Sequence, residues 1–233
     1  MSRMTPNQAH VRYTAEQYDD YTKEFVKPYD DMLAAWVLQE SRKLPAAFTL
    51  LDVGTGTARF LIHLASIPEL DAVRLIGTDA FDDMIQTGSA AIGNAGFANR
   101  IELILDTVHN MKLPSNLAHL IVSRSTLHHW KDATFPDPVP RALQEIFRVL
   151  KPGGMALIVD VRRDAPPEAV EKFNTQRRQA GIGDSFLGEK FTVAEVQAFA
   201  ETAGIGSYCT VEAGKSGLSL LGLALVIKKP LDL

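Results

Sequence analysis

Two groups of residues in this 233-residue sequence have types and spacing that suit chemistry. The first is the stretch D-V-G-T-G-T-A, in which Asp52 is followed closely by Gly54 and Gly56. The second is the run L-H-H-W, which places His128 beside His129. Glycine has no Cβ, so the first group can form a tight turn whose backbone approaches a ligand. An imidazole can accept a proton near neutral pH, so the second group supplies candidates for a general base.

The glycine stretch predicts a strand, a turn and a helix that together hold a nucleoside cofactor. Residues 48–53 form an apolar run typical of a buried strand, and a helix expected over 57–67 would direct its unpaired N–H groups at the ligand. A nicotinamide or flavin site follows G-x-G-x-x-G/A, but here the third position is Arg59 and the small residue, Ala58, comes one place earlier. A tight turn without a ligand would use the same glycines, so the pattern alone leaves a structural role open.

Beyond this stretch the chain alternates between predicted strands and helices. Further strands are expected at residues 73–78, 101–105, 117–123, 155–161, 207–212 and 218–227, and further helices at residues 82–93 and 139–150. Only A-G-K-S-G separates the last two strands, which is too short for a parallel crossover, so they should form an antiparallel hairpin. The pattern predicts an α/β fold: a doubly wound, mostly parallel seven-stranded sheet with an antiparallel C-terminal hairpin strand and helices on both faces.

The first 45 residues lie outside this alternation. They are expected to form an N-terminal helical cap segment that Pro28 breaks or kinks, while residues 46–233 form one domain. Within that domain, residues 164–190 are rich in Gly, Asp and Arg and are a candidate lid.

Three carboxylates lie at the carboxyl ends of consecutive predicted strands. Asp52, Asp79 and Asp106 each stand at a strand's carboxyl end, where open α/β sheets bind ligands. Asp79 comes 25 positions after Gly54, which suits a carboxylate that accepts hydrogen bonds from both ribose hydroxyls. Each carboxylate alone is equally compatible with a helix cap or a solvated turn.

The sequence resembles the class I S-adenosylmethionine-dependent methyltransferases. The D-x-G-x-G-x-A pattern resembles their motif I, I-G-T-D-A-F resembles their motif II, and the resemblance covers about residues 45–160. It departs at Ala58, where a third glycine is more usual. The resemblance implies S-adenosylmethionine as cofactor. It implies cofactor contacts from Asp52, Gly54, Thr55, Gly56, Asp79, Ala80, Met84, Asp106, Thr107 and Ser123, and from Tyr13 and Tyr18 in the cap segment.

In the resembling family, the segment after the fourth strand faces the transferred methyl group. Here that segment carries His128 and His129, which point in different directions in any regular conformation, so at most one is expected in the pocket. One of them could act as a general base; alternatively, both pack against Trp130 while Asp132 fixes one ring. No metal site is expected, because adjacent imidazoles do not converge on one ion. Ser123 and Arg124 are further candidates for contacts with the substrate.

The resemblance favours methyl transfer to a small-molecule acceptor, and three other classes of protein remain. A dehydrogenase is disfavoured by Arg59 and by the terminal hairpin. A non-catalytic cofactor-binding protein would share the same motifs. An enzyme on the same scaffold could direct attack to another carbon of the sulfonium, for example by an intramolecular cyclisation that releases methylthioadenosine.

Composition narrows the expected partners and location. The net charge is −4 and the basic residues are scattered, so a nucleic-acid partner is not expected. With no signal-peptide segment and no long apolar span, neither membrane insertion nor secretion is expected, and the chain should be cytoplasmic. Cys209 is the single cysteine and is expected to act as a small hydrophobe in a strand. The expected partner is a small-molecule substrate, and the chain should be a monomer or homodimer.

Overall fold

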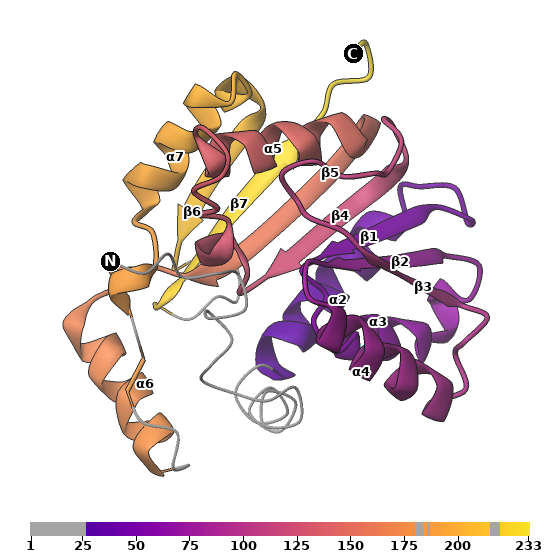
Figure 1. Ribbon diagram of the computed structural model, residues 1–233, viewed down its shortest axis with the longest axis horizontal. Coiled ribbons are helices and arrows are strands. Elements are labelled where there is room, and N and C mark those ends of the chain that lie inside the picture. Colours follow the sequence, from indigo (N-terminus) through magenta and orange to yellow (C-terminus); the bar gives the residue numbers. More distant parts are fainter. Residues whose placement is uncertain (1–26, 180–183, 186, 215–219) are drawn as a thin grey trace.

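The computed structural model describes residues 27–179, 184–185, 187–214 and 220–233 (Figure 1). The predicted cap segment is therefore described only from Lys27 onward, and Tyr13 and Tyr18 lie outside the described residues. The division into a cap segment and one domain stays a prediction.

A seven-stranded sheet with the order β3-β2-β1-β4-β5-β7-β6 forms the centre of the molecule (Figure 1). The strands are β1 (Thr49–Val53), β2 (Arg74–Asp79), β3 (Ile101–Leu105), β4 (Ala118–Arg124), β5 (Leu150–Val161), β6 (Cys209–Ala213) and β7 (Gly222–Lys228). The first five strands are parallel, and β7 runs antiparallel between β5 and β6. The predicted fold class is confirmed. Strand order reverses between β1 and β4, which makes the carboxyl edge of these two strands the place where such sheets bind ligands.

Helices cover both faces of the sheet (Figure 1). They are α2 (Lys27–Ser41), α3 (Arg59–Ala65), α4 (Asp82–Asn94), α5 (Pro138–Val149), α6 (Pro167–Gln179) and α7 (Val193–Thr202), with short 3-10 turns η2 (Pro68–Leu70), η3 (Leu127–His129), η4 (Leu187–Glu189) and η5 (Gly206–Tyr208). Leu33 of α2 and Leu64 of α3 belong to one core cluster, and Leu143 of α5 belongs to the other. Leu50 and Leu51 of β1 are fully buried in opposite clusters, because side chains alternate along a strand.

Two of the element boundaries that differ from those predicted have a clear local reason. The helix expected over 57–67 is α3, which starts at Arg59 because Ala58, at its N-cap, has the left-handed φ of 60°. The K-P-G-G stretch was predicted to separate a helix from a strand starting near Met155. It lies within β5 instead, since Leu150 already pairs with Ala118 and the register shifts before Leu120.

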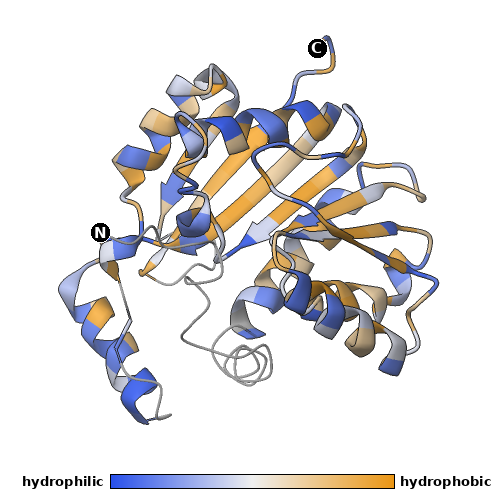
Figure 2. Cartoon of the chain, viewed as in Figure 1, coloured by the Kyte–Doolittle hydropathy of each residue, from blue (hydrophilic) through white to orange (hydrophobic). Residues whose placement is uncertain are grey.

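The chain leaves the carboxyl end of β5 after Val161 and is again beside it at Phe191. Arg162 and Phe191 form a parallel bridge, and the Arg163 N–H donates to the Phe191 carbonyl at 3.0 Å. This stretch contains α6, which projects away from the sheet in Figure 1 and is mostly hydrophilic in Figure 2. We call residues 164–190 the excursion; its role as a lid stays a prediction. Among the helices of the described ranges, none has the length and apolar character to cross a bilayer.

Candidate cofactor and acceptor site

The glycine turn after β1 is held by the end of β2. The N–H groups of Gly54 and Thr55 both donate to the Thr78 carbonyl, at 2.8 and 2.9 Å. Gly54 and Gly56 have φ values of 72° and 56°, and Ala58 has 60°. Since residues with a Cβ rarely adopt this conformation, the alternation of small residues follows from the backbone that the turn requires. The third glycine that is more usual in the resembling family would occupy the position of Ala58 with less strain.

The segment after β4 packs directly on this turn. A Cβ built on Gly54 would lie 2.4 Å from Cγ2 of Thr126, so the glycine is needed for close approach as well as for its φ. The Ser123 hydroxyl donates to the Val53 carbonyl at 2.8 Å and lies 2.5 Å from Oγ1 of Thr126. Ser123 therefore supports the backbone at the start of the turn through its hydrogen bond to Val53. Its contact with a cofactor stays a prediction. Thr126 was missed, because nothing in the sequence indicates which side chain faces Gly54.

Asp79 joins β2 to the turn. One carboxylate oxygen accepts from the Gly56 N–H at 2.8 Å and the other from the Phe81 N–H at 3.1 Å. The side chain is buried, Ala80 beside it is exposed, and Met84 is buried in the first turn of α4. The structure thus brings Asp79 to the edge of the glycine turn, where the sequence predicts a ribose contact.

Asp52 is a buried carboxylate at the carboxyl end of β1. It is 4% exposed and accepts a hydrogen bond from Oγ1 of Thr55 at 2.8 Å. Burial raises the pKa of Asp52 to about 7, against the opposing effects of the Thr55 hydroxyl and the Arg124 charge. The neighbouring carboxylates Asp30 and Asp79 raise this pKa further. A cationic group bound beside Asp52 would favour its ionised form.

Helix α2 is tied to the same edge by a buried ion pair. Nη1 of Arg124, at the end of β4, lies 2.8 Å from Oδ1 of Asp30, and these side chains are 13% and 9% exposed. Arg124 was predicted as a substrate-side contact, and that role stays a prediction. Asp30 was missed because it lies in the cap segment, for which no motif fixes the register.

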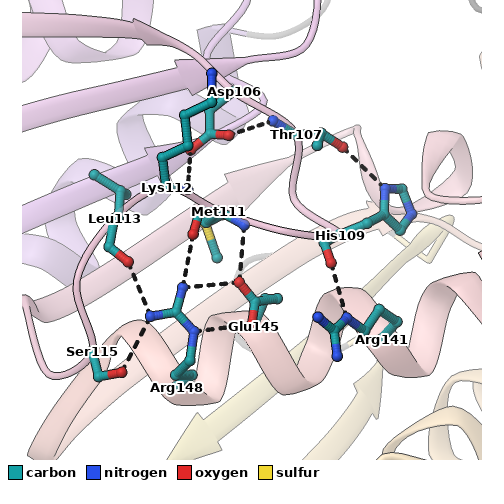
Figure 3. A network of polar contacts seen from close by, with 10 residues as sticks. All are labelled: Asp106, Thr107, His109, Met111, Lys112, Leu113, Ser115, Arg141, Glu145 and Arg148. Carbon is teal, nitrogen blue, oxygen red and sulfur yellow. Dashed lines mark hydrogen bonds and ion pairs between the residues drawn. The ribbon is translucent and has the colours of Figure 1, made fainter.

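A polar network fixes the loop after β3 (Figure 3). The Asp106 carboxylate accepts from the N–H groups of Thr107 and Lys112, at 2.9 and 2.8 Å. From α5, Glu145 accepts from the Met111 N–H at 2.9 Å, and Arg148 donates to the Met111 carbonyl at 2.9 Å. Asp106 and Thr107, both predicted cofactor contacts, are therefore held on a loop with little freedom.

His128 lies between two charged side chains, Asp160 and Lys190, in the segment that packs on the glycine turn. Its Nδ1 lies 2.7 Å from Oδ2 of Asp160 at the end of β5, and its Nε2 lies 2.6 Å from Nζ of Lys190. Burial alone would raise the pKa of Asp160, but His128, Lys190 and the Val161 N–H together hold this pKa well below its usual range. The ionised carboxylate therefore orients the imidazole, with Nδ1–H donating and Nε2 available as a base.

The two adjacent histidines were predicted to point in different directions; they differ in exposure, but their rings are in contact. His128 is buried, whereas His129 is exposed, with its ring centre 3.9 Å from that of His128. The alternative in which Asp132 fixes a ring is not what the structure shows for His128: Asp132 accepts from Thr134, and Asp160 fixes His128. Asp160 was missed, although it lies within one residue of the carboxyl end of a predicted strand, as the other three aspartates do. In the part of the chain that the structure describes, no group of three or more His, Cys, Asp or Glu side chains could hold a metal ion.

The chain is similar to known methyltransferases in both sequence and structure. Residues 51–158 match the family model described as a methyltransferase domain. An uncharacterized methyltransferase of Bacillus subtilis is 27% identical over 186 residues, 78% of this chain and 67% of that protein. A putative S-adenosyl-L-methionine-dependent methyltransferase of Methanococcus maripaludis has a similar fold, with a TM-score of 0.68, 22% identity, and coverage of 99% of this chain and 96% of the other.

Two further relatives have named substrates. A demethylmenaquinone methyltransferase of Bacteroides fragilis is 27% identical over 112 residues, 48% of this chain and 42% of the relative. A U6 snRNA (guanine-N(2))-methyltransferase of Bos taurus is 27% identical over 125 residues, 54% of this chain and 24% of the relative. The chain spans less than half the length of these two relatives.

Proposed function

This chain carries an S-adenosylmethionine-dependent methyltransferase domain of class I, and from that premise we propose that it methylates a small-molecule acceptor. S-adenosylmethionine is the cofactor of the domain, and when bound it supplies a methyl group activated by a sulfonium. Methyl transfer is an in-line displacement, so the task of the protein is to position two reactants and to manage one proton.

The observation that carries the proposal is the set of acceptors around the glycine turn. Asp52, Asp79 and Asp106 end or follow three neighbouring parallel strands, and each is buried. The cofactor presents an ammonium, ribose hydroxyls and an adenine amine, all of which are hydrogen-bond donors. The chemistry of the carboxylates therefore fits this group, with Asp79 suited to the ribose, Asp106 to the adenine and Asp52 to the ammonium.

On the acceptor side, His128 is the proposed general base and Asp160 its positioning residue. The Asp160 carboxylate accepts from both Nδ1 and the backbone N–H of His128, which fixes the ring with Nε2, the proposed proton acceptor, beside Nζ of Lys190. His129 is exposed, whereas His128 is buried against Asp160. It is the weaker of the two predicted candidates.

A small acceptor is supported by charge and by one relative. The formal net charge of −4 gives a polyanion no general attraction, and the relative from Bacteroides fragilis is named for a small quinone substrate. The relative from Bos taurus is named for an RNA substrate, so RNA belongs in the test.

The test begins with the cofactor. Calorimetric titration with S-adenosylmethionine, S-adenosylhomocysteine and NAD should show binding of the first two only. The protein is then incubated with S-adenosylmethionine alone, with a panel of small acceptors, or with RNA, and the nucleoside product is identified. S-adenosylhomocysteine formed only with a small acceptor supports the proposal. Catalytic release of methylthioadenosine without an acceptor would show cyclisation instead, turnover with RNA alone would reassign the substrate, and no turnover with any acceptor would indicate a binding protein.

A further inference from the structure

The excursion ends at a lysine that lies against the proposed base. Nζ of Lys190 is 2.6 Å from Nε2 of His128 and 4.0 Å from Oδ1 of Asp160, and its side chain is 16% exposed. The backbone at this point is fixed, because Arg163 donates to the Lys190 carbonyl at 3.1 Å and to the Glu195 carboxylate at 2.5 Å. The position of the Lys190 ammonium is thus fixed by the hydrogen bond to its backbone carbonyl from Arg163 and by its own contact with the His128 imidazole.

The hydrogen bond from the Lys190 ammonium to His128 is one that a ligand can replace. The Asp160 carboxylate is already engaged, accepting from the Val161 N–H at 2.7 Å and from His128 at 2.7 and 3.1 Å. An ammonium has three donors, but within the described residues Nε2 of His128 is its one hydrogen-bond acceptor. A buried cation is normally satisfied by a carboxylate, so a contact with a neutral ring nitrogen is one that an anionic ligand can replace.

The charges around Lys190 favour an anion at this point. Burial lowers the pKa of Lys190, the charges of Asp160 and Glu189 raise it, and those of Lys131 and Arg177 lower it again. Asp160 faces Nδ1 of His128, and the cation that meets Nε2 is the ammonium of Lys190 itself. A ligand carrying its own positive charge would be repelled there, whereas an oxyanion would be stabilised.

The same point lies beside the cofactor turn. Thr126, whose methyl group packs on Gly54, is two residues before His128 in the same short segment. Gly54 belongs to the turn to which we assign the cofactor, so we place the acceptor atom beside Lys190 and His128, where it would displace their mutual contact and face the cofactor.

We propose that Lys190 binds the ionised oxygen of the acceptor, and that the acceptor is therefore a phenol or an enol. This inference rests on the proposed function and names the substrate class of that site. The acceptor's O–H bond breaks and its proton goes to Nε2 of His128, giving an imidazolium stabilised by Asp160. The ammonium of Lys190 transfers its hydrogen bond from Nε2 to the oxyanion. The anion's electron pair forms the bond to the methyl carbon, and the methyl–sulfur bond breaks with its pair on sulfur.

The experiment uses the full chain saturated with S-adenosylhomocysteine, so that no turnover is needed. The probes are p-nitrophenol, whose ionised form has its own absorbance band, and p-nitroaniline, a neutral amine of the same shape. At a pH below the pKa of free p-nitrophenol, the bound probe should show a larger ionised fraction than the free probe. The amine should bind at least tenfold more weakly than the phenol, because it offers no anion.

Variants separate the role of the ammonium from a role in folding. Lys190→Met keeps the length of the side chain and removes its charge, and should lower the affinity for p-nitrophenol by about ten- to a hundredfold and abolish the spectral shift. Lys190→Arg should restore part of both signals. The matched control is Lys151→Met, because Lys151 also contacts a histidine, with Nζ 3.4 Å from Nε2 of His119, but does so near the amino end of the sheet. Lys151→Met should behave as wild type.

The possible outcomes distinguish this inference from the proposed function. If wild type fails to bind S-adenosylmethionine in calorimetry, the proposed function is wrong. Normal cofactor binding with no ionisation of p-nitrophenol would overturn only the inference about Lys190. The same holds if Lys190→Met, with unchanged cofactor affinity and melting temperature, still ionises the probe, or if p-nitroaniline binds as tightly as the phenol.

Discussion

At the scale of single residues, the carboxylate of Asp79 both holds the backbone of the glycine turn and is the proposed acceptor for the ribose hydroxyls. It accepts from the N–H groups of Gly56 and Phe81, and we assign it to the ribose hydroxyls. Asp79→Ala should weaken S-adenosylmethionine binding by about 1.5–3 kcal/mol, since the hydroxyls lose a charged acceptor. Asp79→Asn keeps one acceptor oxygen and should lose less. The control for calorimetry is Asp83→Ala, which removes an exposed carboxylate from the first turn of α4, the helix that follows Asp79. Wild-type affinity in Asp79→Ala would refute the assignment to the ribose.

Gly54 offers a test of packing within the turn. Gly54→Ala should destabilise the protein by about 2–3 kcal/mol, because its φ is 72° and the new methyl group would lie 2.4 Å from Cγ2 of Thr126. Thr126→Ser removes that methyl group and keeps the hydroxyl beside Ser123.

If the contact with Thr126 is the main cost, the double variant should be more stable than the sum of the two single effects predicts, by more than 0.5 kcal/mol in urea unfolding. Strict additivity would show that the strain of φ alone accounts for the loss.

The two histidines form a matched pair for kinetics. His128→Ala should lower the rate of methylation about a hundredfold or more while leaving cofactor affinity nearly unchanged, because the proposed base is lost. His129→Ala, at the exposed neighbouring position, should retain most of the rate. Equal turnover in both variants would leave His128 with a structural role only, and a lowered melting temperature in His128→Ala would point to packing.

At the scale of elements, the pair between Asp30 and Arg124 fixes α2 on the sheet. Asp30→Ala leaves the Arg124 guanidinium buried without its carboxylate, and should destabilise the protein by about 3–5 kcal/mol. The double variant Asp30→Ala with Arg124→Met removes both charges and should recover much of the loss. A double variant less stable than Asp30→Ala in urea unfolding would show that the pair itself is a minor part of the contact.

Elements were well predicted where a single local pattern decides them. The strand at 101–105 has the predicted bounds, since its apolar run is flanked by polar residues. The short A-G-K-S-G connection was sufficient to predict an antiparallel pair. The start of β5 was wrong because K-P-G-G suits a helix end and also tolerates a strand with a bulge, and only the pairing of Leu150 with Ala118 decides between them.

The site was predicted less completely than the fold, for a physical reason. Asp52 and Asp79 stand in motifs that are local in sequence, so spacing alone could place them. Asp160 and Lys190 meet His128 only because β5 lies beside β4 and the excursion returns to β5. Contacts between segments so far apart in sequence depend on the whole topology, and no pattern within one window contains them.

At the scale of the whole molecule, stability should respond to pH through two aspartates in opposite directions. The folded-state pKa of Asp52 is raised from 3.8 to about 7, so between these values the folded chain binds a proton that the unfolded chain has lost. The free energy of unfolding should therefore fall as the pH rises from about 4 to about 7, by up to about 4 kcal/mol, and then level off. The lowered pKa of Asp160 gives stability above about pH 4 that is lost at lower pH.

Asp52→Asn isolates the first effect, because the amide keeps the shape and an acceptor for the Thr55 hydroxyl. In urea unfolding between pH 5 and pH 8, the variant should lack the decline seen in wild type and should be the more stable protein at pH 8. Parallel curves for the two proteins would mean that Asp52 stays ionised in the folded state across this range. The variant should at the same time bind S-adenosylmethionine more weakly.

The bridge between Arg162 and Phe191 makes the excursion a segment that can be replaced by another of different length. Because the chain departs and rejoins at neighbouring positions, a segment of different length could be substituted between them without moving β5 or the start of α7. The entropy of closing such a loop grows slowly, by about 0.6 kcal/mol for each doubling of its length. We assign acceptor preference in part to Lys190, the last residue of the excursion. Acceptor preference can thus change among related proteins with this fold while the glycine turn and its aspartates stay the same.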